Sequence, residues 1–198
     1  MARASACPII RAKSRWISPR SRLAGPALAS LSDDPLTADA ARLLEIGRWI
    51  TGPNGALVTE VLSVKESRGT RIAVCDAGFN NHLAAAGMMG AVFRKNYPFA
   101  VLRCARGGDE VEHQIAGPLC TSIDTMARKL MLPPLSRGDV LAVLLSGAYG
   151  LTASPTRFIS HPEPGEYLID AGGGLTDISE SRLNASGSLM ADLTEARA

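Results

Sequence analysis

Aromatic residues make up only 5% of this 198-residue sequence and charged residues 20%, and the formal net charge at pH 7 is +2. So small a charge imbalance does not indicate a nucleic-acid-binding domain, and it points to no particular class of partner. Hydrophobic residues nevertheless account for 46% of the sequence, which is too many for a chain that is disordered throughout. A chain of this length can bury one good core, which corresponds to about one domain of typical size.

Paired cysteines are also missing. The four cysteines are scattered, with no Cys-x-x-Cys pair and no His-x3-His spacing, so the sequence predicts no metal site. Sparse thiols of this kind are typical of proteins from a reducing compartment. Cys75 and Cys104 lie within apolar strand patterns, and we expect both side chains in the core.

Long apolar segments are absent as well. No run comes near the roughly 20 apolar residues that cross a bilayer, and no segment has the apolar region of a secretory signal peptide. We therefore expect no membrane partner and a cytoplasmic location. Acidic residues are absent before Asp33, whereas this segment is basic, Ser-rich and broken by proline. Such a composition is compatible with a transit peptide or a basic arm, and we favour a disordered leader over residues 1–34.

Short apolar strands dominate the sequence after residue 55. Turns are predicted at 67–69 and 106–109, where Ser-Arg-Gly and Arg-Gly-Gly-Asp interrupt the apolar pattern. Runs rich in Val, Ile and Leu predict strands at residues 56–66, 70–76, 99–105, 110–116, 139–146 and 166–169.

Helices are few in this prediction. One is expected at residues 38–44, capped by Thr37, and a second at 122–131, ended by two prolines. A glycine run then introduces a flexible tail over residues 170–198. Many short strands without an internal repeat predict a mainly β fold, a β-sandwich or a partly open β-barrel with one or two short helices.

Two motifs in the second half of the chain carry side chains suited to a binding site. The first is Gly117-Pro118-Leu119-Cys120-Thr121-Ser122-Ile123-Asp124, in which a Gly-Pro turn presents a thiol at a loop tip. The second, Gly147-Ala148-Tyr149-Gly150, places a tyrosine between small residues, where its phenol can cover a ligand. Three further motifs accompany them: Glu45-Ile46-Gly47-Arg48, Val74-Cys75-Asp76-Ala77-Gly78-Phe79-Asn80 and His161-Pro162-Glu163-Pro164-Gly165-Glu166-Tyr167-Leu168.

In this order and spacing the five motifs resemble those of the fold-type III pyridoxal-phosphate decarboxylases, the ornithine/diaminopimelate/arginine decarboxylase family. The similarity covers about residues 45–169 and corresponds to that family's C-terminal β-domain. The resemblance implies a β-domain at residues 49–169 preceded, at 35–48, by a remnant of the family's N-terminal (β/α)8 barrel. It also implies a C-terminal domain or fragment of an amino-acid decarboxylase, inactive alone, that pairs with a barrel domain or forms a homodimer.

The resemblance assigns roles to six residues. Cys120 would be the catalytic proton donor, reaching across a dimer interface, since a thiol is mostly protonated at neutral pH. Thr121 and Asp124 would face the substrate. Thr121 stands where decarboxylases of basic amino acids have an acidic residue, so substrates with a distal amine are not expected, and a carrier-bound amino acid becomes an alternative. The cofactor pyridoxal 5'-phosphate would be contacted by Tyr149, Glu45 and Arg48.

The lysine that binds the cofactor covalently in this family has no counterpart. The chain contains only Lys13, Lys65, Lys95 and Lys129, and none lies in a matching motif, so we expect no covalent cofactor here. Two alternatives stay open: a non-enzymatic β-domain that binds a decarboxylase subunit or another partner, and a racemase-like domain, against which the Gly-Pro-Leu-Cys motif counts. The three histidines, at 82, 113 and 161, have no nucleophile at a recognisable spacing and are expected to be structural or surface groups.

Overall fold

The computed structural model describes residues 26, 29–31, 33–41, 43, 45–89 and 95–179. Most of the predicted leader, including Lys13, lies outside these residues, as does the part of the predicted tail beyond residue 179. The chain divides into two compact units, residues 1–154 and 155–198. Within the described part of the chain, no helix is both long enough and apolar enough to cross a membrane.

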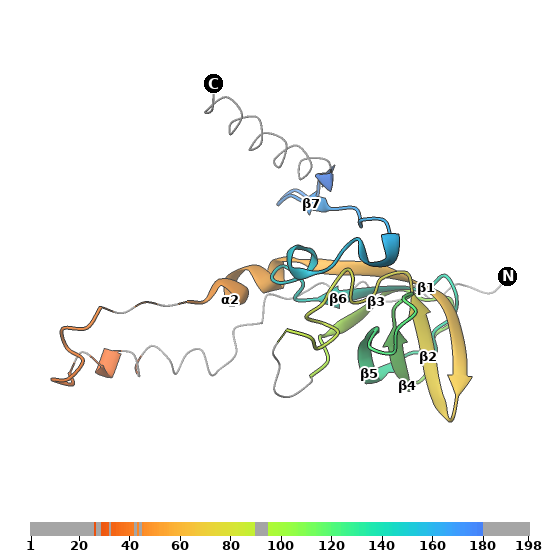
Figure 1. Cartoon of the computed structure of the whole chain (residues 1–198), viewed down its shortest axis with the longest axis horizontal. Coiled ribbons are helices and arrows are strands. Elements are labelled where there is room, and N and C mark those ends of the chain that lie inside the picture. The colour runs from red at the N-terminus through yellow and green to blue at the C-terminus, as the bar shows by residue number, and fades with distance from the viewer. Residues whose placement is uncertain are drawn as a thin grey trace, which may run out of the picture. The chain divides into compact units, whose positions relative to one another are not determined.

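The first unit is built around one six-stranded sheet (Figure 1). Its strands lie in the order β3-β6-β1-β2-β4-β5, and all neighbours are antiparallel except β2 and β4, which are parallel. The strands are β1 (Ala56–Ser67), β2 (Thr70–Cys75), β3 (Phe99–Arg103), β4 (Val111–Ala116), β5 (Thr125–Leu132) and β6 (Val140–Leu144).

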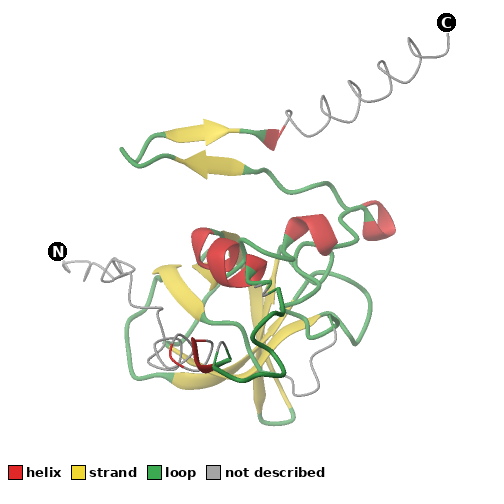
Figure 2. Ribbon diagram, turned by 90° about the vertical axis from the view of Figure 1, so that its left-hand side faces the viewer, coloured by secondary structure: helices red, strands yellow, loops and turns green. Residues whose placement is uncertain are grey.

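Strand β1 is long enough to pair with β6 along its first part and with β2 along the rest. Residues 56–60 pair with β6, and the pairing with β2 begins at Val61. The register shifts between Val61 and Ser63, which marks an irregularity of the kind that bends and twists a strand. The sheet accordingly curls into a half-barrel (Figure 2).

The two edges of the sheet approach each other through Asn96, which lies three residues before β3. Its amide Nδ2 donates to the carbonyl of Arg128 on β5 at 2.6 Å, and its Oδ1 accepts from the Arg128 N–H at 3.2 Å. An asparagine side chain thus makes the two hydrogen bonds that a neighbouring strand would make. This contact joins the opposite ends of the strand order, so the expectation of a partly open β-barrel is confirmed, and a two-sheet sandwich is not formed.

The concave side of the sheet holds the main core. It contains Val61, Cys75, Ile115, Met126 and Leu141, each fully buried. A smaller apolar cluster joins Phe79, Ala86 and Leu119 and connects the loop after β2 with the loop after β4. Cys75 is therefore a core residue as predicted, whereas Cys104, one residue past β3, is only half-buried.

Short helical segments complete the two units. The first unit contains the α-helix α2 (Gly47–Thr51) and the 3-10 helices η1 (Gly52–Asn54) and η2 (Leu151–Ala153). The second contains η3 (Phe158–Ser160) and a hairpin of β7 (Tyr167–Ile169) and β8 (Leu175–Asp177). Strand β8 lies within the tail predicted to be flexible, and Asp170 closes the turn before it by accepting from the N–H groups of Gly172 and Gly174. The flexibility of the tail stays a prediction.

Both predicted helices were wrong. The described residues of 38–44 form turns and irregular backbone, because the Thr37 hydroxyl donates back to the carbonyl of Leu31 instead of capping a following helix. Residues 125–132 form strand β5, paired with β4. In this strand Lys129 has a φ of +51° and the pairing with β4 is irregular. Side chains therefore do not alternate regularly between the two faces, and the apolar residues have a spacing similar to that of a helix.

Replacing Ile115 by Ala tests whether the concave side is the core. We expect Ile115→Ala to lower the free energy of unfolding by about 2–5 kcal/mol, because it leaves a cavity at a fully buried position. Ile50→Ala, at a position 55% exposed, is the matched control and should change it by less than about 0.5 kcal/mol. Urea denaturation measures both, and equal losses in the two variants would contradict this assignment.

Candidate functional site

The carboxylate of Asp124 joins the two loops that contain the family-like motifs. Asp124 is 3% exposed, at the end of the loop between β4 and β5. Its Oδ1 accepts from the N–H of Phe79 and its Oδ2 from the N–H of Leu119, both at 2.8 Å. Each oxygen therefore anchors a different loop, and hydrogen bonds from backbone N–H to a carboxylate are among the stronger ones in proteins.

Two glycines make room for this carboxylate. A Cβ atom at Gly78 or at Gly117 would overlap the oxygens of Asp124. The Gly117 N–H also donates to the Asp124 carbonyl at 3.1 Å. The glycines of the two motifs are thus required by the close approach of the loops to a buried charge.

The anchored loop presents Cys120 and Thr121 at its tip. Cys120 is exposed, and Thr121 is half-buried. The Thr121 N–H donates to the Leu119 carbonyl at 2.8 Å, and the Thr121 carbonyl accepts from Asp124 N–H at 3.2 Å. These tight turns fix the loop backbone while leaving the Cys120 thiol accessible to a ligand or to another chain.

Arg48 and Tyr149 meet although 101 positions separate them. The Arg48 guanidinium carbon lies 4.4 Å from the centroid of the Tyr149 ring, a cation–π contact. Tyr149 is 47% exposed and has a φ of +56°, a backbone conformation that bulky residues rarely adopt. Such outliers concentrate at binding sites, where the surrounding structure holds them in place.

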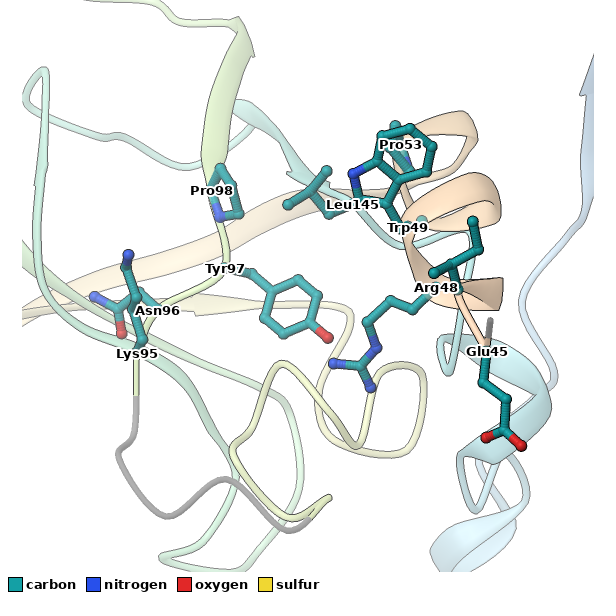
Figure 3. A pocket seen from close by; sticks show the side chains of 11 residues that line it. Glu45, Arg48, Trp49, Pro53, Lys95, Asn96, Tyr97, Pro98 and Leu145 are labelled. Carbon is teal, nitrogen blue, oxygen red and sulfur yellow. The ribbon is translucent and has the colours of Figure 1, made fainter. Parts of the chain in front are cut away.

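Beside this pair the structure has a largely apolar pocket of about 940 Å³ (Figure 3). Helix α2 and the preceding Glu45 form one wall, and residues 95–98 form another. In Figure 3 the Arg48 guanidinium and the Tyr97 hydroxyl point toward each other, while the Glu45 carboxylate points the opposite way. Trp49, Lys95 and Leu145 also line the pocket.

His82 packs behind Tyr97. Its ring makes an edge-to-face contact with the Tyr97 ring, with 4.8 Å between centroids and a 69° interplanar angle. The imidazole is fully buried, and its Nδ1 accepts from the Ala85 N–H at 3.2 Å. Burial, and secondarily the positive charge of Arg48, lowers the pKa of His82 to about 4. The ring is therefore neutral at physiological pH, with its proton on Nε2.

The structure thus separates the predicted site residues into two groups. Arg48 and Tyr149 are in contact, with Glu45 at the pocket edge. Cys120 and Thr121 do not line this pocket, and Asp124 is buried beneath them. The predicted roles of all six residues stay predictions, but Asp124 is placed to hold the loop and not to meet a ligand directly, since both its oxygens already accept backbone N–H groups.

The sequence analysis did not single out Tyr97 or Trp49, which line the pocket. His82 was expected to be a structural or surface group, and it is a fully buried residue whose ring accepts a hydrogen bond from the backbone. Among the described residues no cluster of His, Cys, Asp and Glu is placed to hold a metal. Burial raises the pKa of Cys75, in the Val74–Asn80 motif, to about 12, so its thiol stays protonated at neutral pH.

Known proteins share both the sequence pattern and the fold of this chain. The family model "Pyridoxal-dependent decarboxylase, C-terminal sheet domain" matches residues 33–147. The chain belongs to this family. Tyr149 and the His161–Leu168 motif lie beyond the matched residues.

Curated relatives are decarboxylases of greater length. The chain is 38% identical over 159 residues to L-glutamyl-[BtrI acyl-carrier protein] decarboxylase of Niallia circulans. The aligned region covers 75% of this chain and 37% of that protein. It is 38% identical over 131 residues to diaminopimelate decarboxylase of Methanothermobacter thermautotrophicus, covering 65% of this chain and 28% of that one. The chain therefore spans about a third of the length of the relatives it matches.

Solved structures share the fold. Diaminopimelate decarboxylase of M. jannaschii in complex with L-lysine superimposes with a TM-score of 0.59 at 26% identity, over 67% of this chain and 29% of that one. Lysine/ornithine decarboxylase of Vibrio vulnificus in complex with cadaverine gives a TM-score of 0.58 at 27% identity, over 73% and 37%. The mainly β fold predicted from the sequence is that of the decarboxylase sheet domain.

Asp124→Asn tests the anchoring of the two loops. The amide keeps the shape of the side chain but can accept only one of the two backbone N–H groups, and an unsatisfied buried donor costs about 1–3 kcal/mol. We expect a loss of that size in unfolding free energy by urea denaturation. Asp109→Asn, at an exposed position, is the control. A variant as stable as the wild type would show that the carboxylate does not hold the loops.

The lowered pKa of His82 predicts a pH-dependent stability. Between about pH 6.5 and pH 4 the unfolded chain binds a proton at His82 that the folded chain does not. The free energy of unfolding therefore decreases as the pH is lowered through this window. The loss reaches about 3 kcal/mol, because one pKa unit corresponds to about 1.4 kcal/mol. Since burial also lowers the pKa of His113, the wild type is compared with His82→Phe, which should show a smaller loss. Identical pH profiles would contradict this prediction.

Proposed function

We propose that this chain functions as the C-terminal sheet domain of a pyridoxal-phosphate-dependent amino-acid decarboxylase, completing an active site together with a barrel domain. The observation that carries the proposal is the division of its functional side chains into two groups. Arg48 and Glu45 line a pocket of this chain and Tyr149 stacks on Arg48, whereas Cys120 is held at an exposed loop tip outside the pocket. A side chain presented in this way suits a site completed on another subunit.

The residues at the pocket fit the cofactor. Among the described residues Arg48 forms no ion pair, so its guanidinium can bind a phosphate. Tyr149 covers the guanidinium, and Glu45 is the carboxylate available for the ring nitrogen. When bound, pyridoxal phosphate supplies the electron sink for loss of the substrate carboxyl group. Because no lysine of this chain lies in a matching motif, the covalent attachment would come from the barrel domain.

Cys120 would return a proton to the product carbon. A thiol can act as a general acid that gives its proton to a carbanion. Its loop backbone is fixed through Asp124, so the thiol is positioned without itself being buried. In a homodimer this loop would enter the site of the partner subunit. The cytoplasmic location predicted from the sequence belongs to the same proposal.

The substrate class follows from Thr121. A hydroxyl carries no charge, so the loop offers no partner for a distal ammonium group. The relative from Niallia circulans acts, by its name, on a glutamyl group linked to an acyl-carrier protein, and such a substrate has no distal amine to recognise. We therefore propose an amino acid linked to a carrier as the substrate, in preference to lysine, ornithine or diaminopimelate.

Complementation tests this function. The full chain is co-expressed with the N-terminal part of the Niallia circulans relative, which supplies the remaining two thirds of that protein. The proposal expects a stable complex that releases CO2 from the carrier-bound substrate. A complex that forms but stays inactive would contradict the catalytic role, and the N-terminal part alone is the control.

Cys120→Ala in this complex should lower turnover about 10²-fold to 10⁴-fold, the effect of losing a general acid, while cofactor binding survives. Turnover is followed as CO2 release and cofactor binding by absorbance. Cys104→Ala, which removes a half-buried thiol outside the loop, is the matched control and should retain turnover. Full activity of Cys120→Ala would exclude the thiol as the proton donor.

Thr121→Glu should shift selectivity toward substrates with a distal amine. A carboxylate at this half-buried position can accept a charge-assisted hydrogen bond of about 1.5–3 kcal/mol from an ammonium, which corresponds to about a 10-fold to 100-fold change in relative kcat/KM. Competition between lysine and the carrier-bound substrate measures the change. Thr121→Gln has a similar length without charge and should not produce it. Unchanged selectivity in Thr121→Glu would show that residue 121 does not face the substrate.

A further inference from the structure

Two glycines touch where the turn that precedes Tyr149 crosses the segment after α2. A Cβ atom at Gly55 would lie 2.6 Å from both the Cα and the backbone N of Gly147, which is closer than Cβ atoms approach other atoms in proteins. A Cβ at Gly147 would overlap the carbonyl oxygen of Thr51. Both obstacles are backbone atoms, which cannot turn aside as the end of a flexible side chain can.

Space, and not backbone conformation, requires glycine at this crossing. Gly55 has a φ of −137° and a ψ of 151°, an extended conformation that any residue adopts. Neither Gly55 nor Gly147 has a positive φ. The two positions therefore need glycine because two backbone segments lie in direct contact there.

Backbone hydrogen bonds join the two segments at the crossing. The Gly147 N–H donates to the Gly52 carbonyl at 3.1 Å, and the Ser146 N–H donates to the Gly55 carbonyl at 2.9 Å. A side chain at Gly55 would push the segments apart and lengthen both bonds. The crossing is therefore a contact that a single added methyl group disrupts.

The crossing controls the distance between Arg48 and Tyr149. On one side, the Gly52 N–H donates to the Arg48 carbonyl, so the crossing is tied to the last turn of α2. On the other side, Tyr149 follows Gly147 by only two residues. The 4.4 Å contact between the guanidinium and the ring thus depends on a crossing in which neither of these side chains takes part.

We propose that Gly55 is a positioning residue for the Arg48–Tyr149 pair, because it lets residues 145–150 lie directly on the segment that follows α2. Gly55 lies outside the five sequence motifs, and it acts through the two side chains and not on a ligand. The consequence for cofactor binding rests on the proposed function, in which Arg48 and Tyr149 contact the cofactor.

NMR spectroscopy of the full chain tests the positioning without any activity. The Tyr149 ring should shift the side-chain proton resonances of Arg48 upfield, and Tyr149→Leu shows where these resonances lie without the ring. In Gly55→Ala the segments must separate, so we expect the Arg48 resonances to move toward their Tyr149→Leu positions. Gly107→Ala adds a methyl group in open space, and this matched control should leave them unmoved.

Arg48 resonances in Gly55→Ala at their wild-type positions would overturn the proposal. Amide resonances of β2, β4 and β5 report whether the variant folds. If it does not fold, the wild type decides. Nuclear Overhauser contacts between the backbone protons of Gly55 and Gly147, together with the upfield shift of Arg48, would support the crossing, and absence of either would refute it.

The complementation complex measures the effect on cofactor binding. Gly55→Ala should raise the pyridoxal phosphate concentration for half-maximal turnover about 10-fold or more, the effect of weakening one charge-assisted hydrogen bond. Turnover at saturating cofactor should change less than about 2-fold, because Asp124 holds the Cys120 loop independently. A lost Arg48 contact with unchanged cofactor affinity would refute the cofactor role of the pair but not the positioning by Gly55. An inactive wild-type complex would contradict only the proposed function, because the NMR measurement needs no cofactor.

Discussion

The Asp124 carboxylate is the interaction on which the arrangement of this domain depends. It lies between the loops that follow β2 and β4, two neighbouring parallel strands, and accepts one backbone N–H from each. Gly78 and Gly117 are needed because a Cβ at either would occupy the space of its oxygens. One buried charge therefore explains two glycines, the geometry of two motifs and the exposed position of the thiol at residue 120.

The curl of the sheet brings together the residues that line the Arg48 pocket. The irregularity in β1 allows one strand to pair with β6 and then with β2, and Asn96 joins the two free edges. This closure places residues 95–98 opposite α2, so Tyr97 and Arg48 face one pocket although they belong to distant parts of the sequence. The residues proposed to be catalytic and those proposed to face the cofactor thus occupy separate places around one sheet.

Much of this could be predicted from the sequence, because apolar strand patterns and glycine-containing motifs are local. The strands near 56–67, 70–75 and 140–144 and the mainly β class are confirmed. The β5 region was predicted as a helix because its irregular pairing and the positive φ of Lys129 remove the two-residue alternation on which strand prediction relies. The lowered pKa of His82 could not be predicted from the sequence, because it depends on burial and on the charge of Arg48, and both arise only in the folded chain.

Amide hydrogen exchange of the isolated chain tests the anchoring by Asp124 most directly. The account predicts that the N–H groups of Phe79 and Leu119, although both lie in loops, exchange as slowly as those of the central strands, because each donates to the same buried carboxylate. Slow exchange of both amides in the wild type, and fast exchange of both in Asp124→Ala, would support the conclusion that this carboxylate holds the two loops. Exchange of either amide at the rate of an open loop in the wild type would contradict it.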